Sequence, residues 1–178
     1  MSLQQHYQNT MRPELVKEFH HTNVLAAPRL EKVVVNVGTG RFSENKKALE
    51  DIAQSLALIT GQKPAITRAK KSIASFKVRE GMDVGMRVTL RGARAFDFLE
   101  RLINIALPRT RDFSGLKKDA FDAKGNYTVG IREAVIFPEI NPQEIQTNFG
   151  MEITVVVSSK SKAEAQAFIA KLGMPLQK

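Results

Sequence analysis

Short stretches of the chain alternate between apolar and polar residues, which is the pattern of half-buried β-strands. Residues 31–37 alternate around three valines at every second position. Further strands are predicted at residues 63–70, 131–137 and 152–158. The clearest strand is residues 84–91, whose two sides are Val84, Met86, Val88 and Leu90 against Gly85, Arg87, Thr89 and Arg91.

Two internal stretches instead place apolar residues at helical spacing. Residues 44–60 have one apolar face, and Gly61 directly after them is the predicted end of that helix. Residues 93–107 have a second such face, and Pro108 closes it because proline cannot continue a helix.

Helices are also predicted near both ends of the chain. Residues 4–20 form the first, with Pro13 at the first position of a second helical piece, where its missing N–H costs little. The last opens at Ser161 and Glu164, which have the spacing of a capping box, and ends before Gly173.

The predicted order is therefore helix, strand, helix, two strands, helix, two strands, helix. This order favours an α+β fold with a mostly antiparallel sheet and helices packed on one face. We expect a single domain over residues 1–178, from which a basic loop at 70–83 and a long polar loop at 108–130 project.

The other face of such a sheet would be open to a ligand. Its outward polar residues suit phosphates, sugars and base edges, and they are Asn36, Arg87, Thr89, Arg91 and Thr154. A sheet of the RNA recognition motif type reads single strands by stacking bases on aromatic residues, and no aromatic residue is predicted here. The layout is therefore RRM-like without stacking aromatics, which favours a folded or helical RNA as the target.

The charge of the chain narrows its class of partner. Its 178 residues carry a net charge of +9 with a sequence pI near 9.9, which favours a polyanion as the partner, either nucleic acid or an acidic membrane surface.

There is no cysteine, so disulfides, thiol catalysis and cysteine-bound metals are excluded. The apolar runs are too short to span a bilayer, and the N-terminus lacks the apolar core of a signal peptide. We expect a cytoplasmic protein with no membrane partner.

Positive charge is concentrated in residues 63–94. Nine basic residues stand there against Glu80 and Asp83, and they are Lys63, Arg68, Lys70, Lys71, Lys77, Arg79, Arg87, Arg91 and Arg94. Most charge runs are simply solvated surface. This one is interleaved with Ser72, Ser75 and Phe76, so it offers hydrogen bonds and an apolar contact beside the charge. We therefore favour contact with RNA.

Other chemistry has weaker support. Gly38-Thr39-Gly40 after a strand resembles the start of a dinucleotide fingerprint, with Arg68 as a possible partner for an NADP phosphate, but Ser43 stands where the third glycine belongs. A tight turn is the simpler interpretation of these glycines.

The histidines lie in the first 21 residues without a matching cluster of metal ligands, and no catalytic motif is present. We predict no enzyme activity, no cofactor and no metal. A DNA-binding or membrane-surface protein would show a helix-turn-helix or a basic amphipathic helix, and neither is predicted.

Several longer segments resemble one known family in order along the chain. They are KVVVNVGTG (32–40), GQKPAITRAKKSIASFKVREGMDVG (61–85), VTLRG (88–92), LPRTRDFSG (107–115), FDAKGNYTVGIRE (121–133), IFPEI (136–140) and LGMP (172–175). The chain is similar to the bacterial form of large-subunit ribosomal protein number five. That resemblance implies a structural part of the large ribosomal subunit that binds 5S rRNA and helps attach it in the central protuberance.

The resemblance also implies site residues. Those expected to face 5S rRNA are Lys32, Asn36, Gln62, Lys63, Arg87, Thr89 and Arg91. Those expected to face the elbow of the peptidyl-site tRNA are Arg68, Lys70, Lys71, Ser72, Ser75, Phe76, Lys77 and Arg79. Residues 108–130 and 138–149 would lie toward large-subunit rRNA, neighbouring ribosomal proteins and a small-subunit head protein across the subunit interface.

Two positions depart from the family pattern. Ser114 stands where the family usually has arginine, so one basic contact of that loop is expected to be missing. Ala123-Lys124 stands where the family often has Gly-Arg, which keeps the charge but reduces the freedom of the backbone. Both departures concern loop contacts.

Overall fold

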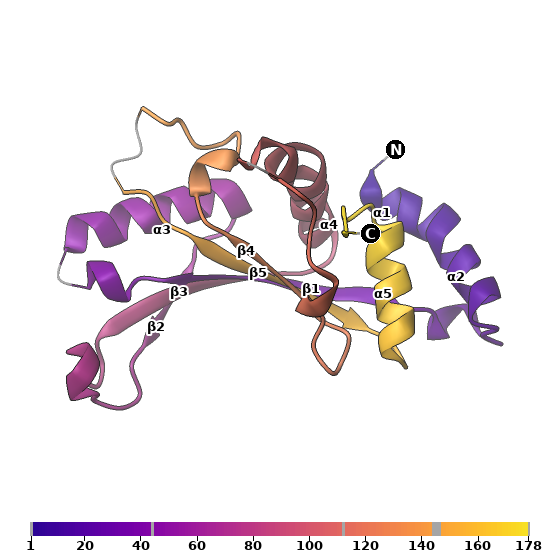
Figure 1. The fold of residues 1–178 in the computed structure, drawn as a ribbon, viewed down its shortest axis with the longest axis horizontal. Helices are drawn as coiled ribbons and strands as arrows, with labels where there is room; N and C mark the ends of the chain where they lie inside the picture. The colour runs from indigo at the N-terminus through magenta and orange to yellow at the C-terminus, as the bar shows by residue number, and fades with distance from the viewer. Residues whose placement is uncertain (1, 44, 112, 144–146, 178) are drawn as a thin grey trace. The chain divides into compact units, whose positions relative to one another are not determined.

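The computed structural model describes residues 2–43, 45–111, 113–143 and 147–177 (Figure 1). One five-stranded antiparallel sheet has the order β2-β3-β1-β5-β4. Its strands are β1 (Arg29–Gly38), β2 (Ala65–Arg68), β3 (Asp83–Leu90), β4 (Tyr127–Ile131) and β5 (Met151–Ser158). The α-helices are α1 (Leu3–His6), α2 (Arg12–Glu18), α3 (Lys46–Thr60), α4 (Ala93–Arg101) and α5 (Lys162–Lys171). The predicted α+β class and the predicted order of elements are confirmed.

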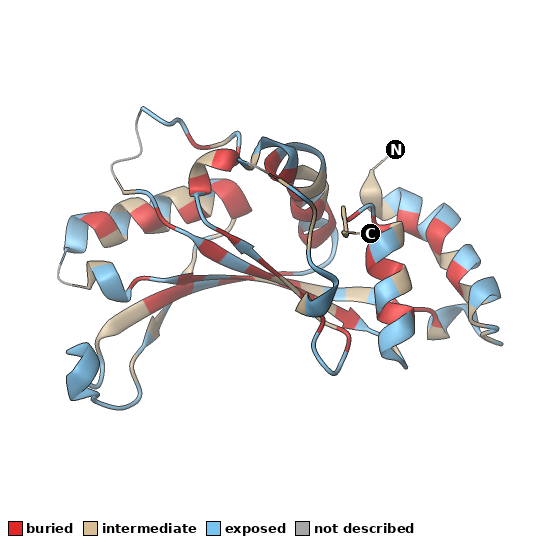
Figure 2. Ribbon diagram, in the orientation of Figure 1, coloured by how far each residue is buried: buried red, intermediate tan, exposed pale blue. Residues whose placement is uncertain are grey.

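The long strands bury one side and expose the other, as their sequence pattern predicted (Figure 2). In β1, Val35 is fully buried while the next residue, Asn36, is exposed. In β3, Met86 and Val88 are buried while Arg87 between them is exposed. No outward position of the five strands, all of which are described, carries an aromatic residue.

The predicted strand at residues 131–137 is wrong. The strand is β4, which lies earlier and buries Tyr127, Val129 and Ile131, while Ala134–Ile136 forms a 3₁₀ turn. The two glycines, Gly125 and Gly130, and the charged Asp122 and Lys124 made this segment resemble a loop. Every second residue from Tyr127 to Ile131 is nevertheless apolar.

The long loop predicted at 108–130 is consequently shorter and partly ordered. Leu116 forms a parallel bridge with Leu176, Phe121 bridges Tyr127, and Lys118–Ala120 is a 3₁₀ turn. Residue 112 of this loop lies outside the described residues.

Two predicted helices contain a π-helical segment. Tyr7–Met11 separates α1 from α2, and Leu102–Ala106 follows α4. Each ends two residues before a proline, Pro13 in one case and Pro108 in the other. Because proline has no N–H and its ring crowds the preceding turn, a widened turn just before it accommodates the lost hydrogen bond.

Helix α3 has the predicted limits to within two residues. The Asn45 side chain accepts a hydrogen bond from the Ala48 N–H at 3.1 Å and caps the start, while the predicted first residue, 44, lies outside the described residues. Gly61 ends the helix at φ +67°, a conformation that favours glycine. Ile52 and Leu56 are fully buried, so α3 contributes its apolar face to the core.

The described residues form two compact units. The terminal unit comprises the described parts of 1–33, 90–129 and 154–178, and the central unit those of 34–89 and 130–153. Strands β1, β3, β4 and β5 each have residues in both units, whereas β2 and α3 belong to the central unit.

Candidate nucleic-acid interface

Five of the seven residues predicted to face 5S rRNA belong to the central unit, and we call them the sheet-face residues: Asn36, Gln62, Lys63, Arg87 and Thr89. Strands β1 and β3, which carry three of them, are neighbours in the sheet. Those three point away from the buried side of their strands, because the residues on either side of each are buried. Period-two geometry thus gathers them on one open surface.

Gln62 and Lys63 reach this surface because α3 ends immediately before them. The Gln62 Nε2 donates a hydrogen bond to the Thr89 carbonyl oxygen at 3.4 Å, and this contact ties the segment after α3 to strand β3. Thr60 reinforces the turn, since its Oγ1 donates toward the Leu56 carbonyl at 2.7 Å and accepts from the Gln62 N–H at 3.3 Å. The Lys63 side chain is exposed.

Close strand packing beside Arg87 depends on Gly85. A Cβ at this position would lie 2.7 Å from the Thr67 Oγ1 and 3.1 Å from the Val37 carbonyl oxygen. β2 runs antiparallel to β3 here, and Ala65 lies opposite Arg87. A larger residue would have to displace the Thr67 hydroxyl and shift the Val37 carbonyl by a few tenths of an ångström, so Gly85 allows the close strand packing beside Arg87.

The other two predicted residues, Lys32 and Arg91, belong to the terminal unit. Both pair with one carboxylate: the Lys32 Nζ and the Arg91 Nη1 each lie 3.9 Å from the Glu31 Oε1. Two cations therefore share one anion, which leaves a local positive charge available for a polyanion.

The eight residues predicted to face tRNA lie between the end of β2 and the start of β3. The basic loop, predicted at residues 70–83, spans residues 68–82 in the structure, and the name is used for this range below. All eight are exposed, and the Phe76 side chain is 74% exposed. The loop is a hairpin rather than a coil, because Ile73 and Val78 exchange two backbone hydrogen bonds at 2.8 and 3.1 Å. The predicted turn at Gly81 is confirmed, with φ +84°.

Two of these eight side chains already have partners in the loop or at the start of β3. The Arg68 Nε lies 3.3 Å from the Asp83 Oδ1, and the Ser72 Oγ accepts a hydrogen bond from the Glu80 N–H at 3.0 Å. Both contacts are exposed, so they orient the side chains without burying them. The remaining charges, Lys70, Lys71, Lys77 and Arg79, are exposed around the turn.

Thr128 is an outward residue that sequence reasoning missed because it placed β4 too late. Its Oγ1 lies 3.1 Å from the Thr154 Oγ1, within hydrogen-bonding distance. The predicted outward Thr154 hydroxyl thus already has a partner in the terminal unit.

The dinucleotide interpretation of Gly38-Thr39-Gly40 is wrong. A dinucleotide-binding unit needs two neighbouring parallel strands joined by a helix. Here β3 lies between β1 and β2 in the sheet, and β2 runs antiparallel to β3. The glycines instead form the turn from β1 into a 3₁₀ helix, Gly40–Phe42.

Among the described residues, no group of three histidine, cysteine or acidic residues could hold a metal ion. No helix in the same part of the chain is long and apolar enough to cross a bilayer.

An α+β protein with a cationic, polar and non-aromatic open sheet has the surface of an RNA-binding protein that reads shape and backbone. The family model for ribosomal protein L5 matches residues 23–79, and the model for the C-terminus of the same ribosomal family matches residues 83–176. The chain belongs to the ribosomal protein L5 family. As a member it is a structural ribosomal protein and not an enzyme.

Individual relatives match over nearly their whole length. Large ribosomal subunit protein uL5 of Spiroplasma kunkelii is 52% identical over 178 residues, which is 100% of this chain and 99% of the relative. The protein of the same name from Thermus thermophilus is 52% identical, with 100% and 98% covered. That from Limosilactobacillus fermentum is 50% identical over 172 residues, with 97% and 96% covered. Bacterial ribosomes are cytoplasmic, which agrees with the predicted compartment.

Proposed function

We propose that this chain binds 5S rRNA through the sheet-face residues, Lys32 and Arg91, and helps attach that RNA to the large subunit in the central protuberance. The observation that carries the proposal is the open side of β1 and β3, where exposed Arg87 and Asn36 alternate with buried apolar residues. The full-length relatives are named large ribosomal subunit proteins, which supports the same assembly for this chain.

The charged and the neutral residues of this surface are expected to contribute to RNA binding in different ways. Lys63 and Arg87 neutralise phosphates and release counterions, which supplies affinity without sequence preference. Asn36 and Thr89 hydrogen-bond to sugars, phosphates or base edges and set the register of the RNA. Because their strands are anchored in the core, these groups are held in place before the RNA arrives, and little ordering entropy is lost on binding.

We propose that the basic loop contacts the peptidyl-site tRNA. Its exposed lysines suit phosphates, and the exposed Phe76 ring offers an apolar contact to a sugar or base. The hairpin backbone limits the number of conformations that the free loop can adopt before it binds tRNA.

The remaining partners are proposed on the family resemblance alone. They are large-subunit rRNA, neighbouring ribosomal proteins and a small-subunit head protein, reached through residues 108–130 and 138–149. Residues 112 and 144–146 of these segments lie outside the described residues. That the chain works as one RNA-binding domain stays a prediction.

The test is equilibrium binding of the purified full-length chain to transcribed 5S rRNA across a salt series. We expect a linear fall of log affinity with log salt, with about 0.7 to 0.9 in slope per neutralised phosphate, and preference over a folded competitor RNA of equal length. Recovery of 5S rRNA with the tagged chain from a lysate supports the same conclusion. Equal affinity for the competitor, or no binding at low salt by a folded sample, would overturn the proposal.

A further inference from the structure

A polar hollow of about 550 Å³ lies within the terminal unit, and none of the sheet-face residues lines it. Its walls come from the start of β1, the loop before β4, and the segment from the end of β5 into α5. The charged and amide side chains that line it are Glu31, Lys32, Lys124, Asn126, Lys160 and Lys162. Ser158, Ser159 and Ser161 add hydroxyl groups.

The loop that carries Lys124 is held by a carboxylate. The Asp122 Oδ1 accepts hydrogen bonds from the Lys124 and Asn126 N–H groups, both at 2.8 Å, and its Oδ2 accepts one from the Asn126 Nδ2 at 2.7 Å. Burial raises the pKa of Asp122, but these bonds and one from the Gly125 N–H outweigh it and lower that pKa below its ordinary value. The Asn126 Oδ1 in turn accepts from the Val157 N–H of β5 at 3.3 Å.

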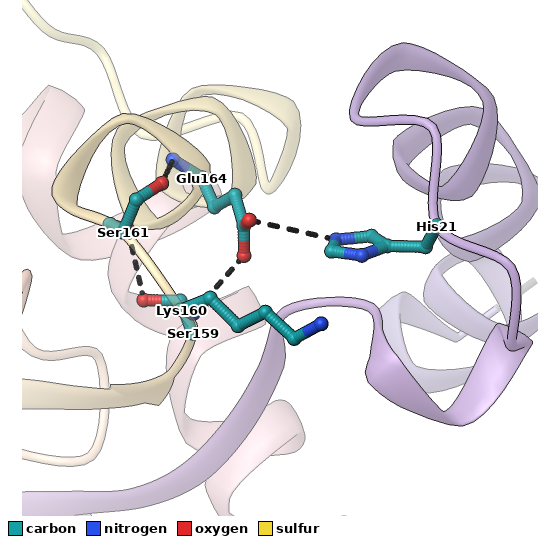
Figure 3. A network of polar contacts seen from close by, with 5 residues as sticks. All are labelled: His21, Ser159, Lys160, Ser161 and Glu164. Carbon is teal, nitrogen blue, oxygen red and sulfur yellow. Dashed lines mark hydrogen bonds and ion pairs between the residues drawn. The ribbon is translucent and has the colours of Figure 1, made fainter.

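The segment that carries Lys160 is held by Glu164, which is 6% exposed (Figure 3). One carboxylate oxygen of Glu164 accepts from the Lys160 N–H at 3.1 Å, and the other lies 3.6 Å from the His21 Nε2. The Ser161 Oγ caps α5 by accepting from the Glu164 N–H at 3.2 Å, and the Ser159 Oγ donates to the Ser161 carbonyl at 3.1 Å. In Figure 3 the Lys160 ammonium takes part in none of the drawn contacts.

The charges of the hollow are unequal. Four lysines face one carboxylate, and that carboxylate, Glu31, is already paired with Lys32 and Arg91. The Lys162 Nζ donates one hydrogen bond, to the Phe121 carbonyl oxygen at 3.3 Å. An ammonium group has three N–H donors, so the other donors of Lys162 can bind a ligand. A hollow with this lining attracts an anion that can accept several hydrogen bonds at once.

A run of backbone phosphates matches this lining. Lysine binds phosphate as a point charge, and four lysines around one hollow match the one negative charge that each phosphate of a nucleic-acid strand carries. We propose that the hollow binds consecutive backbone phosphates of the same 5S rRNA that the sheet-face residues bind. Lys32 lines the hollow and also belongs to the residues proposed to bind 5S rRNA.

This inference rests on the proposed function, and its test separates the two. The full-length Lys124→Gln/Lys160→Gln variant is compared with wild type for binding to transcribed 5S rRNA across a salt series. Loss of two phosphate contacts is expected to reduce the slope of log affinity against log salt by about 1.4 to 1.8. Ethylation interference should identify two adjacent phosphates whose modification weakens wild type and leaves the variant unaffected.

Two matched variants guard against a general effect of charge or folding. Lys46→Gln/Lys47→Gln removes the same charge from the exposed start of α3 in the central unit, and its slope is expected to match wild type. Lys124→Arg/Lys160→Arg keeps the charge and should retain the wild-type slope. Circular dichroism and thermal melting establish that each variant is folded.

Each outcome decides between the alternatives. If wild type binds 5S rRNA but the Lys124→Gln/Lys160→Gln slope is unchanged, the hollow proposal is wrong and the proposed function stands. If that variant instead loses affinity only for a poly-glutamate peptide, the hollow binds an acidic protein segment and the phosphate assignment is overturned. If wild type does not bind 5S rRNA at all, the proposed function itself fails.

Discussion

The sheet face and the basic loop belong to the same unit and carry the same kinds of side chain, yet they are built differently. Arg87 and Asn36 stand between buried neighbours on strands of the five-stranded sheet. Along the basic loop, by contrast, Lys70 through Lys77 are all exposed, and the hairpin is closed by backbone bonds between Ile73 and Val78.

Positive charge is therefore presented in two ways, on strands that are anchored in the core and on an exposed hairpin. On the sheet, the position of a cation depends on the core beneath it, so damage to the core should also damage RNA binding. In the loop, no buried side chain holds the tip, so its residues should change without cost to the fold. Variants that make the same chemical change in the two regions test this difference.

The largest effect is expected for valine truncation in the two places. Val88 is 1% exposed and lies between Arg87 and Thr89, whereas Val78 is half-buried in the basic loop. Val88→Ala should lower the free energy of unfolding by about 2 kcal/mol, because burial of two methyl equivalents is lost and a cavity remains. Val78→Ala should cost less than about 1 kcal/mol. Denaturant unfolding measures both, and equal losses would contradict the comparison.

A neutral contact on the sheet face is expected to have the next largest effect. Asn36→Ala should weaken 5S rRNA binding by about 1 to 2 kcal/mol, because a phosphate, sugar or base group loses its partner in a desolvated contact. The salt slope should stay the same, since no charge is removed. Gln54→Ala on the exposed side of α3 is the control, and an equal loss there would remove Asn36 from the interface.

Removal of one cation should produce a smaller but diagnostic change. Arg87→Gln is expected to reduce the salt slope for 5S rRNA by about 0.7 to 0.9, the contribution of a single phosphate. Arg79→Gln in the basic loop removes the same charge and should leave that slope unaltered. A slope that responds to Arg79 and not to Arg87 would show that the two surfaces are exchanged.

The smallest effect on 5S rRNA is expected for charge reversal at the loop. Lys70→Glu/Lys71→Glu should change 5S rRNA affinity less than about threefold at physiological salt, because the loop lies outside the proposed contact and screening weakens distant charges. The same variant should release peptidyl-site tRNA faster from assembled ribosomes, as measured by filter binding. Normal tRNA retention together with lost 5S rRNA binding would refute the assignment of the loop.

The sequence predicted the parts of the fold that depend on local pattern. Alternation located β1, β3 and β5 because the two sides of a strand face different surroundings, and helical spacing located α3 because its apolar face lies in the core. It failed at β4, where glycine and charged residues near Tyr127 masked a five-residue alternation. It also gave no sign of the π-helical turns before Pro13 and Pro108, which depend on how a helix adapts to a missing donor.

The charge, the polar side of each long strand, the exposure of the basic loop and the family can all be read from the amino-acid sequence. The folded chain was needed to show which strands are neighbours, that Lys32 and Arg91 share Glu31, and that Lys124, Lys160 and Lys162 line one hollow. The reason is physical: periodicity reports which way a side chain faces relative to its own backbone. Proximity between residues 31, 124 and 160 depends on the pairing of β1, β4 and β5, which no local pattern specifies.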